Sequence, residues 1–141
     1  KASAKRNSLY VREFTREDQR QVLLVLDPFT PANTAEPADD QSFERSVSLC
    51  ASLAWYFYEM DSVLGFCTAG HETPPAPASE VIYDILRQLA LAAPLSAETS
   101  SAFLAEMADS SEMFKIILTR QPRGTIPSAL WSSSYILFIE S

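Results

Sequence analysis

The chain begins with two apolar segments of different character. Residues 8–14, SLYVREF, alternate apolar and polar side chains, which is typical of a strand with one face in water. Residues 21–27, QVLLVLD, stay apolar until Asp27, which is typical of a central strand buried on both faces. The short charged link between them predicts an antiparallel hairpin with 8–14 at the sheet edge. Similar apolar runs predict three more strands, at 62–68, 112–120 and 134–140.

Apolar residues at helical spacing separate these strands. They predict a largely buried helix at 43–61, a second at 80–93 and a weaker third at 96–109. Residues 28–41 and 69–78 are rich in proline and alanine, and we expect both to be loops. Helices between apolar strands favour right-handed crossovers and a mostly parallel sheet. The expected fold class is α/β, a three-layer sandwich whose sheet has one antiparallel edge strand.

Length, charge and composition restrict the classes of function. The 141 residues suit one domain with a single core, so 1–141 is expected to be a single domain. The net charge of −7 argues against a nucleic-acid surface, although six of the 11 basic residues lie in the first 20 positions. Only three glycines are present, and none forms a phosphate-binding loop motif. No run reaches the roughly 20 apolar residues of a membrane span, and two cysteines without disulfide or zinc spacing favour a cytoplasmic location.

Asp27 is the first candidate for chemistry, because ligands of parallel sheets bind beyond the carboxyl ends of the strands. With Thr30 and Thr68 it could contribute oxygens to a magnesium or manganese ion, which takes about six oxygen ligands. The next alternate positions, Phe29 and Pro31, offer no side-chain ligand. Arg120, at the end of another predicted strand, would place a positive charge at the same edge. An ion pair between Asp27 and Arg120 is the structural alternative to a metal.

Cys67 and His71 are the second candidate. A cysteine nucleophile needs an accessible thiol within hydrogen-bond reach of its base. Cys67 alternates with apolar neighbours in a predicted strand, which favours a buried and unreactive thiol.

Several large apolar residues fall in segments expected at the ends of strands. They either form an apolar contact patch at the carboxyl edge of the sheet or fold back to cap the core. The set comprises Pro28, Phe29, Pro31, Ile126, Pro127, Leu130 and Trp131.

The first half of the chain resembles a known family. KASAKRNSLYVREF, then QVLLVLD, then FERSVSLCASLAWYFYEMDSVLGFCTAG, is similar in order and spacing to the bacterial domain of unknown function 58 family. The likeness covers most of residues 1–71 and is looser beyond, where SYILFIE resembles the closing strand of that family. The family is regarded as similar to von Willebrand factor A domains, so the resemblance implies that Rossmann-like α/β fold.

The resemblance also bears on the metal hypothesis and on partners. Von Willebrand factor A domains carry a D-x-S-x-S metal-ion-dependent adhesion motif after the first strand. Here its aspartate corresponds to Asp27, while its serines fall on Phe29 and Pro31, so the motif is degenerate. Members are often encoded near MoxR-type AAA+ ATPases and often have membrane segments ahead of this domain. The resemblance therefore implies an adaptor for such an ATPase, cut from a longer protein that upstream segments could anchor to a membrane.

Together these observations predict a non-catalytic protein-interaction domain without a cofactor. Its binding edge is expected to consist of Asp27, Phe29, Thr30, Thr68 and Arg120. Two alternatives stay open: a magnesium- or manganese-dependent binding domain that uses Asp27, and an enzyme that uses Cys67 and His71.

Overall fold

The computed structural model describes residues 21–31, 41–96, 100–109 and 113–139. The strand predicted at 8–14, and its hairpin, lie outside these residues. The described elements, in chain order, are β1 (Gln21–Leu26), α3 (Gln41–Glu59), β2 (Val63–Thr68), β3 (His71–Pro77), α4 (Ala78–Leu91), α5 (Ser100–Asp109), β4 (Phe114–Thr119), the 3-10 turn η3 (Arg123–Thr125), α6 (Ser128–Ser133) and β5 (Ser134–Phe138).

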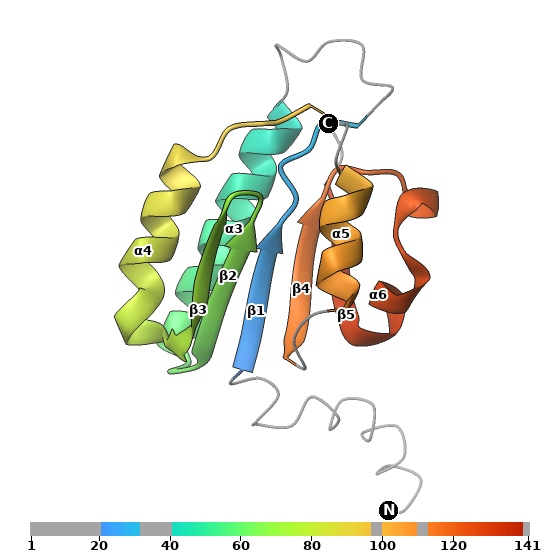
Figure 1. The fold of residues 1–141 in the computed structure, drawn as a ribbon. Coiled ribbons are helices and arrows are strands. Elements are labelled where there is room, and N and C mark those ends of the chain that lie inside the picture. Colours follow the sequence, from blue (N-terminus) through green and yellow to red (C-terminus); the bar gives the residue numbers. More distant parts are fainter. Residues whose placement is uncertain (1–20, 32–40, 97–99, 110–112, 140–141) are drawn as a thin grey trace, which may run out of the picture.

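Five strands form one sheet in the order β3-β2-β1-β4-β5, with helices on both sides (Figure 1). Strand β1 lies in the centre and pairs in parallel with β2 and β4, while β4 pairs in parallel with β5. This confirms an α/β fold with a mostly parallel sheet. It also confirms that QVLLVL is a central strand, because all of its residues except Gln21 are buried.

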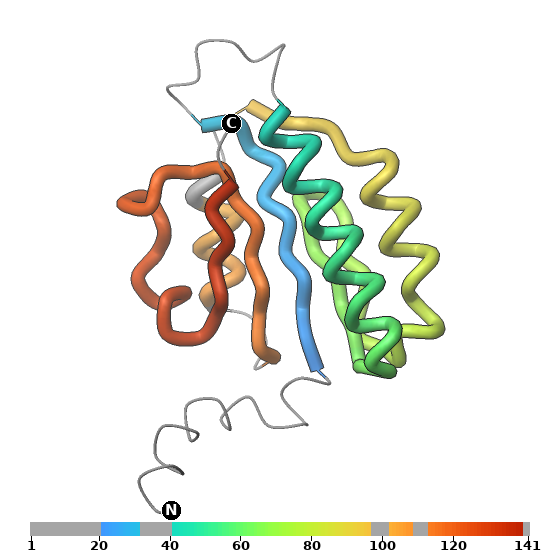
Figure 2. Tube along the Cα trace, turned by 180° about the vertical axis from the view of Figure 1, so that it is seen from behind, coloured from blue at the N-terminus to red at the C-terminus, as the bar shows by residue number. Residues whose placement is uncertain are grey.

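The alternation of side chains along β1 divides the core into two layers. Val22, Leu24 and Leu26 pack beneath α3 and α4. Leu23 and Val25 point to the opposite face, where α5 and α6 cover the sheet. Figures 1 and 2 show α3 and α4 on one face and α5 on the other.

The antiparallel edge strand is β3, which the sequence analysis interpreted as a loop. It pairs with β2 through a tight turn in which Gly70 has a φ of 87°. Its two consecutive prolines, Pro74 and Pro75, fall where the register between Leu64 and Phe66 shifts. Proline is compatible with a strand at an edge or a bulge, because no ladder hydrogen bond from its nitrogen is needed there. The loop prediction was therefore wrong for 71–77, while residues 69–70 form the turn.

Among the described residues, no helix is long and apolar enough to span a bilayer.

Candidate functional site

The carboxylate of Asp27 is buried at the carboxyl end of the central strand. Each oxygen of its side chain accepts a hydrogen bond. Oδ1 accepts from the backbone N–H of Phe29 at 3.0 Å, and Oδ2 accepts from the hydroxyl of Thr119 at 2.8 Å. The residue is 0% exposed, and its own N–H donates to the carbonyl of Leu118 at 2.9 Å. The hydrogen bonds of Asp27 therefore connect the segment after β1 to the end of β4.

Two residues that follow β4 add further hydrogen bonds between these segments. The Arg120 guanidinium donates to the carbonyl of Pro28 at 3.1 Å, and the Gln121 side-chain amide donates to the carbonyl of Phe29 at 3.0 Å. The guanidinium carbon also lies 5.1 Å from the centre of the Phe43 ring, within range of a cation–π contact. Both polar side chains are buried, so the carbonyls they satisfy need no water.

Thr30 and Thr68 lie at the same end of the sheet but nearer to solvent. Thr30 donates its N–H to the carbonyl of Leu95 at 2.7 Å, and Leu95 donates back to the carbonyl of Pro28 at 2.9 Å. The Thr68 hydroxyl donates to the carbonyl of Leu26 at 2.8 Å. Both threonines are half-buried.

The five residues predicted for the binding edge thus lie at one end of the sheet. Only Thr30 and Thr68 are partly accessible, whereas Asp27, Phe29 and Arg120 lie beneath the surface. The ion pair between Asp27 and Arg120 stays a prediction. Thr119 and Gln121 were not singled out from the sequence, because a pairing across 92 residues brings them to Asp27 and Phe29.

The apolar loop residues mostly cap the core. Phe29, Ile126 and Leu130 are buried in the layer beneath α5 and α6. Trp131 is 46% exposed and stacks on Phe138 at 5.7 Å between ring centres. Phe138 is the last residue of β5 and pairs with Thr119, so the Trp131 ring lies beside the carboxyl end of this edge strand. The interpretation in which these residues cap the core fits the buried members better than a single contact patch does.

A groove of about 530 Å³ opens beside the carboxyl end of β2, between the β2–β3 turn and α5. Its apolar wall includes Phe29, Phe103 and Met107, and the two phenylalanine rings lie 6.0 Å apart. Glu72 on β3 and Glu106 on α5 contribute exposed carboxylates. We call this the α5 groove; its other lining residues are Cys67, Thr68, Ala69, Gly70, His71 and Ala102.

The structure separates Cys67 from the imidazole of His71. Cys67 packs with the layer beneath α5, whereas the His71 side chain lies on the α4 face, with its ring 6.4 Å from that of Phe66. Burial, followed by the charges of Glu72 and Glu106, raises the pKa of the Cys67 thiol to about 11. At neutral pH this thiol is protonated, which is the opposite of what a nucleophile requires. The geometry gives the proposed Cys67–His71 pair no support.

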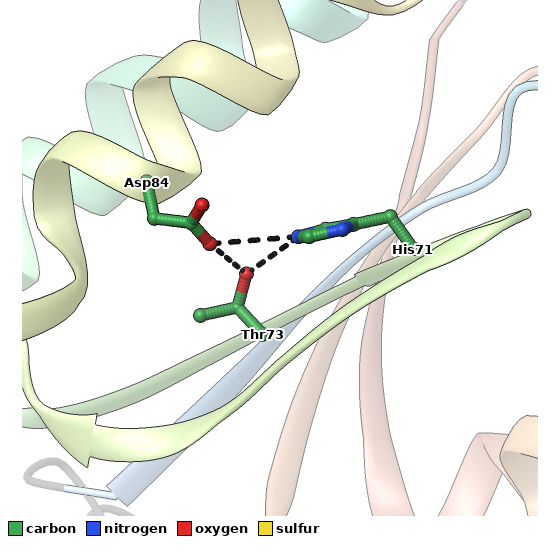
Figure 3. A network of polar contacts seen from close by, with 3 residues as sticks. All are labelled: His71, Thr73 and Asp84. Atoms are coloured by element: carbon green, nitrogen blue, oxygen red, sulfur yellow. Dashed lines mark hydrogen bonds and ion pairs between the residues drawn. The ribbon is translucent and has the colours of Figure 1, made fainter.

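His71 instead joins a polar cluster that the sequence did not indicate (Figure 3). The Thr73 hydroxyl donates to Oδ2 of Asp84 at 2.6 Å, and Nε2 of His71 lies 2.9 Å from that hydroxyl and 3.5 Å from the same carboxylate oxygen. The hydrogen bond from Thr73 lowers the pKa of the Asp84 carboxyl, and His71 adds to this effect. The cluster ties the edge strand β3 to α4. Its only sequence signal is the i, i+2 spacing of His71 and Thr73, which matters only once β3 is known to be a strand.

Comparison with known proteins identifies the family. The family described as Protein of unknown function DUF58 matches residues 1–118, so the chain belongs to that family. No curated protein and no solved structure matches the chain significantly.

Proposed function

We propose that this DUF58 family member is a non-catalytic protein-interaction domain with a von Willebrand factor A-like fold, and that it contacts its partner through the carboxyl end of the sheet. The proposal rests on the burial and the hydrogen bonds of Asp27. Both of its carboxylate oxygens accept hydrogen bonds from within the domain, and the residue is fully buried. Asp27 thus stabilises the edge from below the surface, and more exposed side chains contact the partner.

The side chains around Asp27 do not fit the metal site that the resemblance implies. Magnesium takes about six oxygens, usually from one or two carboxylates with hydroxyls and waters. Phe29 and Pro31 replace the two serines of the adhesion motif. The Thr68 hydroxyl proton is directed to the carbonyl of Leu26, and the Thr119 hydroxyl proton to Asp27 itself. With both motif serines missing and the Asp27 carboxylate fully buried, too few side-chain oxygens face outward to hold such an ion, so the proposed interaction involves no metal.

Two features support contact with a protein. The accessible part of the edge combines half-buried threonines with the α5 groove, whose lining is both apolar and charged. Protein interfaces have this mixed composition, with an apolar centre and a polar rim. The net charge of −7 disfavours nucleic acid as the partner. A MoxR-type AAA+ ATPase is the partner we propose, on the basis of the family resemblance alone.

A binding measurement with the purified domain tests this proposal. The domain is immobilised, and the MoxR-type ATPase of the same organism is added over a concentration series. Thr30→Arg places a large charged side chain at the carboxyl edge, while Ser133→Arg makes the same charge change on exposed α6 near the other end. We expect Thr30→Arg to weaken binding at least tenfold and Ser133→Arg to leave it unchanged. Absence of binding by the wild type would refute the proposal. So would an equal loss of affinity in Thr30→Arg and Ser133→Arg, provided that both variants keep the melting temperature of the wild type.

A further inference from the structure

The α5 groove combines an apolar wall with two acidic groups. Glu72 enters from β3 and Glu106 from α5, and both line the groove together with Cys67. Phe103 and Met107, from the same helix as Glu106, are 8% exposed each and provide the apolar surface. The groove therefore combines carboxylates from two elements with an apolar wall contributed by α5.

Among the described residues that line the groove there is no lysine or arginine, and the imidazole of its one histidine, His71, is directed to Asp84 on the α4 face. Its two carboxylates thus create a local negative potential that no lysine or arginine of the described lining neutralises, in a domain that is already acidic overall. An occupant that complements this groove needs one positive charge and an apolar stem. Arginine meets both needs better than lysine does, because its guanidinium is planar, weakly hydrated, bonds carboxylates through paired N–H groups and packs on aromatic rings.

We propose that the α5 groove binds an arginine side chain presented by a segment of a partner protein. In this arrangement the guanidinium lies between Glu72 and Glu106, and the methylene stem packs on Phe103 and Met107. The groove adjoins Thr68 and Phe29 at the carboxyl edge, so the inference rests on the proposed function and specifies the chemistry of the partner.

A short peptide provides the test of charge and shape. The probe is acetyl-Leu-Phe-Arg-Leu-amide, and its matched control carries citrulline, which has the size of arginine without the charge. Binding is followed through the amide nitrogen–proton correlation spectrum of the labelled domain. We expect the arginine peptide to shift the amide signals of Cys67, Ala69 and Ala102, and to bind at least about fivefold more tightly than the citrulline peptide, as expected for ion pairs at a partly exposed site. Equal binding of the two peptides, or no shift of these signals, would overturn the inference.

Paired variants locate the effect. Glu72→Gln/Glu106→Gln removes both groove carboxylates and keeps their shape, while Glu59→Gln/Glu80→Gln makes the same change in net charge at exposed positions on α3 and α4. We expect the groove pair to weaken the arginine peptide about fivefold or more and the control pair to change its affinity less than twofold. Equal weakening by both pairs would indicate nonspecific attraction to an acidic domain and would overturn the inference.

The same variants separate this inference from the proposed function. If the ATPase binds wild type and Glu72→Gln/Glu106→Gln equally, the groove is not the arginine site of that interface and the inference falls, while binding through the edge stands. If the arginine peptide binds selectively but the ATPase does not bind, the inference stands and the proposed function falls.

Discussion

Replacement of Asp27 should be among the most damaging single changes at the carboxyl edge. Asp27→Ala removes the acceptor of two buried hydrogen bonds, from the N–H of Phe29 and the hydroxyl of Thr119. A hydrogen bond to a charged group contributes about 1.5–3 kcal/mol, and a buried donor left without a partner costs about 1–3 kcal/mol. Removal of a buried carboxylate also relieves its desolvation cost, so we expect a net loss of about 3 kcal/mol.

Urea unfolding followed by circular dichroism measures this loss against a domain stability of about 5–15 kcal/mol. Asp27→Asn keeps the shape and one acceptor oxygen, so it should lose less, about 1–2 kcal/mol. Asp84→Ala is the matched control, because its carboxylate is 43% exposed and water can replace it at a cost of about 1 kcal/mol or less. If Asp27→Ala costs no more than Asp84→Ala, the carboxylate does not hold the two strand ends together.

Three further predictions follow from other parts of the molecule. Gly65→Ala should destabilise the domain by about 1–3 kcal/mol in the urea titration, because the added methyl would lie 3.1 Å from Leu23 and 3.3 Å from the backbone oxygen of Thr73. Gly124→Ala, where the added methyl has no atom within 4 Å, should be nearly neutral. Equal effects of the two changes would contradict the close packing at Gly65. At pH 8 a disulfide reagent should label Cys67 about a hundredfold more slowly in the native than in the unfolded protein, because its pKa rises from 9.0 to about 11; rapid native labelling would revive the enzyme hypothesis. Thr73→Val should raise the pKa of Asp84, measured by carbon NMR of the carboxyl, because the hydrogen bond that lowers this pKa most is lost. An unchanged pKa would contradict that hydrogen bond. In the wild type, the stability that the lowered pKa provides is present above pH 3.8 and is lost as the pH falls through the folded-state pKa.

Much of the sheet could be predicted because its strands are strongly patterned. The continuous apolar run of β1 requires burial on both faces, and only a central strand provides this. The predicted helices and strands from 43 onward correspond to α3, β2, α4, α5, β4 and β5, with ends that differ by a few residues.

Strand β3 could not be predicted, because its signal is weak in the sequence. HETPPAP has three prolines and no alternation of apolar residues, so local preference favours a loop. Its pairing with β2 arises from the tight turn at Gly70 and from the bulge that accommodates the prolines. These are features of the partner strand and the turn, not of the segment alone.

The carboxyl edge, too, could be predicted only in part from the sequence. The order of the elements placed Asp27 at the end of the central strand, and the structure bears this out. Whether its oxygens face solvent or the protein depends on Thr119, which follows 92 residues later and meets Asp27 only through the pairing of β1 with β4. Glu72 and Glu106 line the same groove for a similar reason, since the fold brings the two separate elements that carry them together.

We infer that Asp27 stabilises the fold and that the carboxyl edge binds its partner without a metal. Thermal unfolding of the wild type and of Asp27→Asn in EDTA, in excess Mg²⁺ and in excess Mn²⁺ tests it most directly. A metal present at a hundred times its dissociation constant would add about 2.7 kcal/mol to the free energy of unfolding, which a melting curve resolves. We predict the same midpoint for the wild type in all three conditions. A midpoint that rises with Mg²⁺ or Mn²⁺ in the wild type, and does not rise in Asp27→Asn, would contradict the account and restore a metal to the edge.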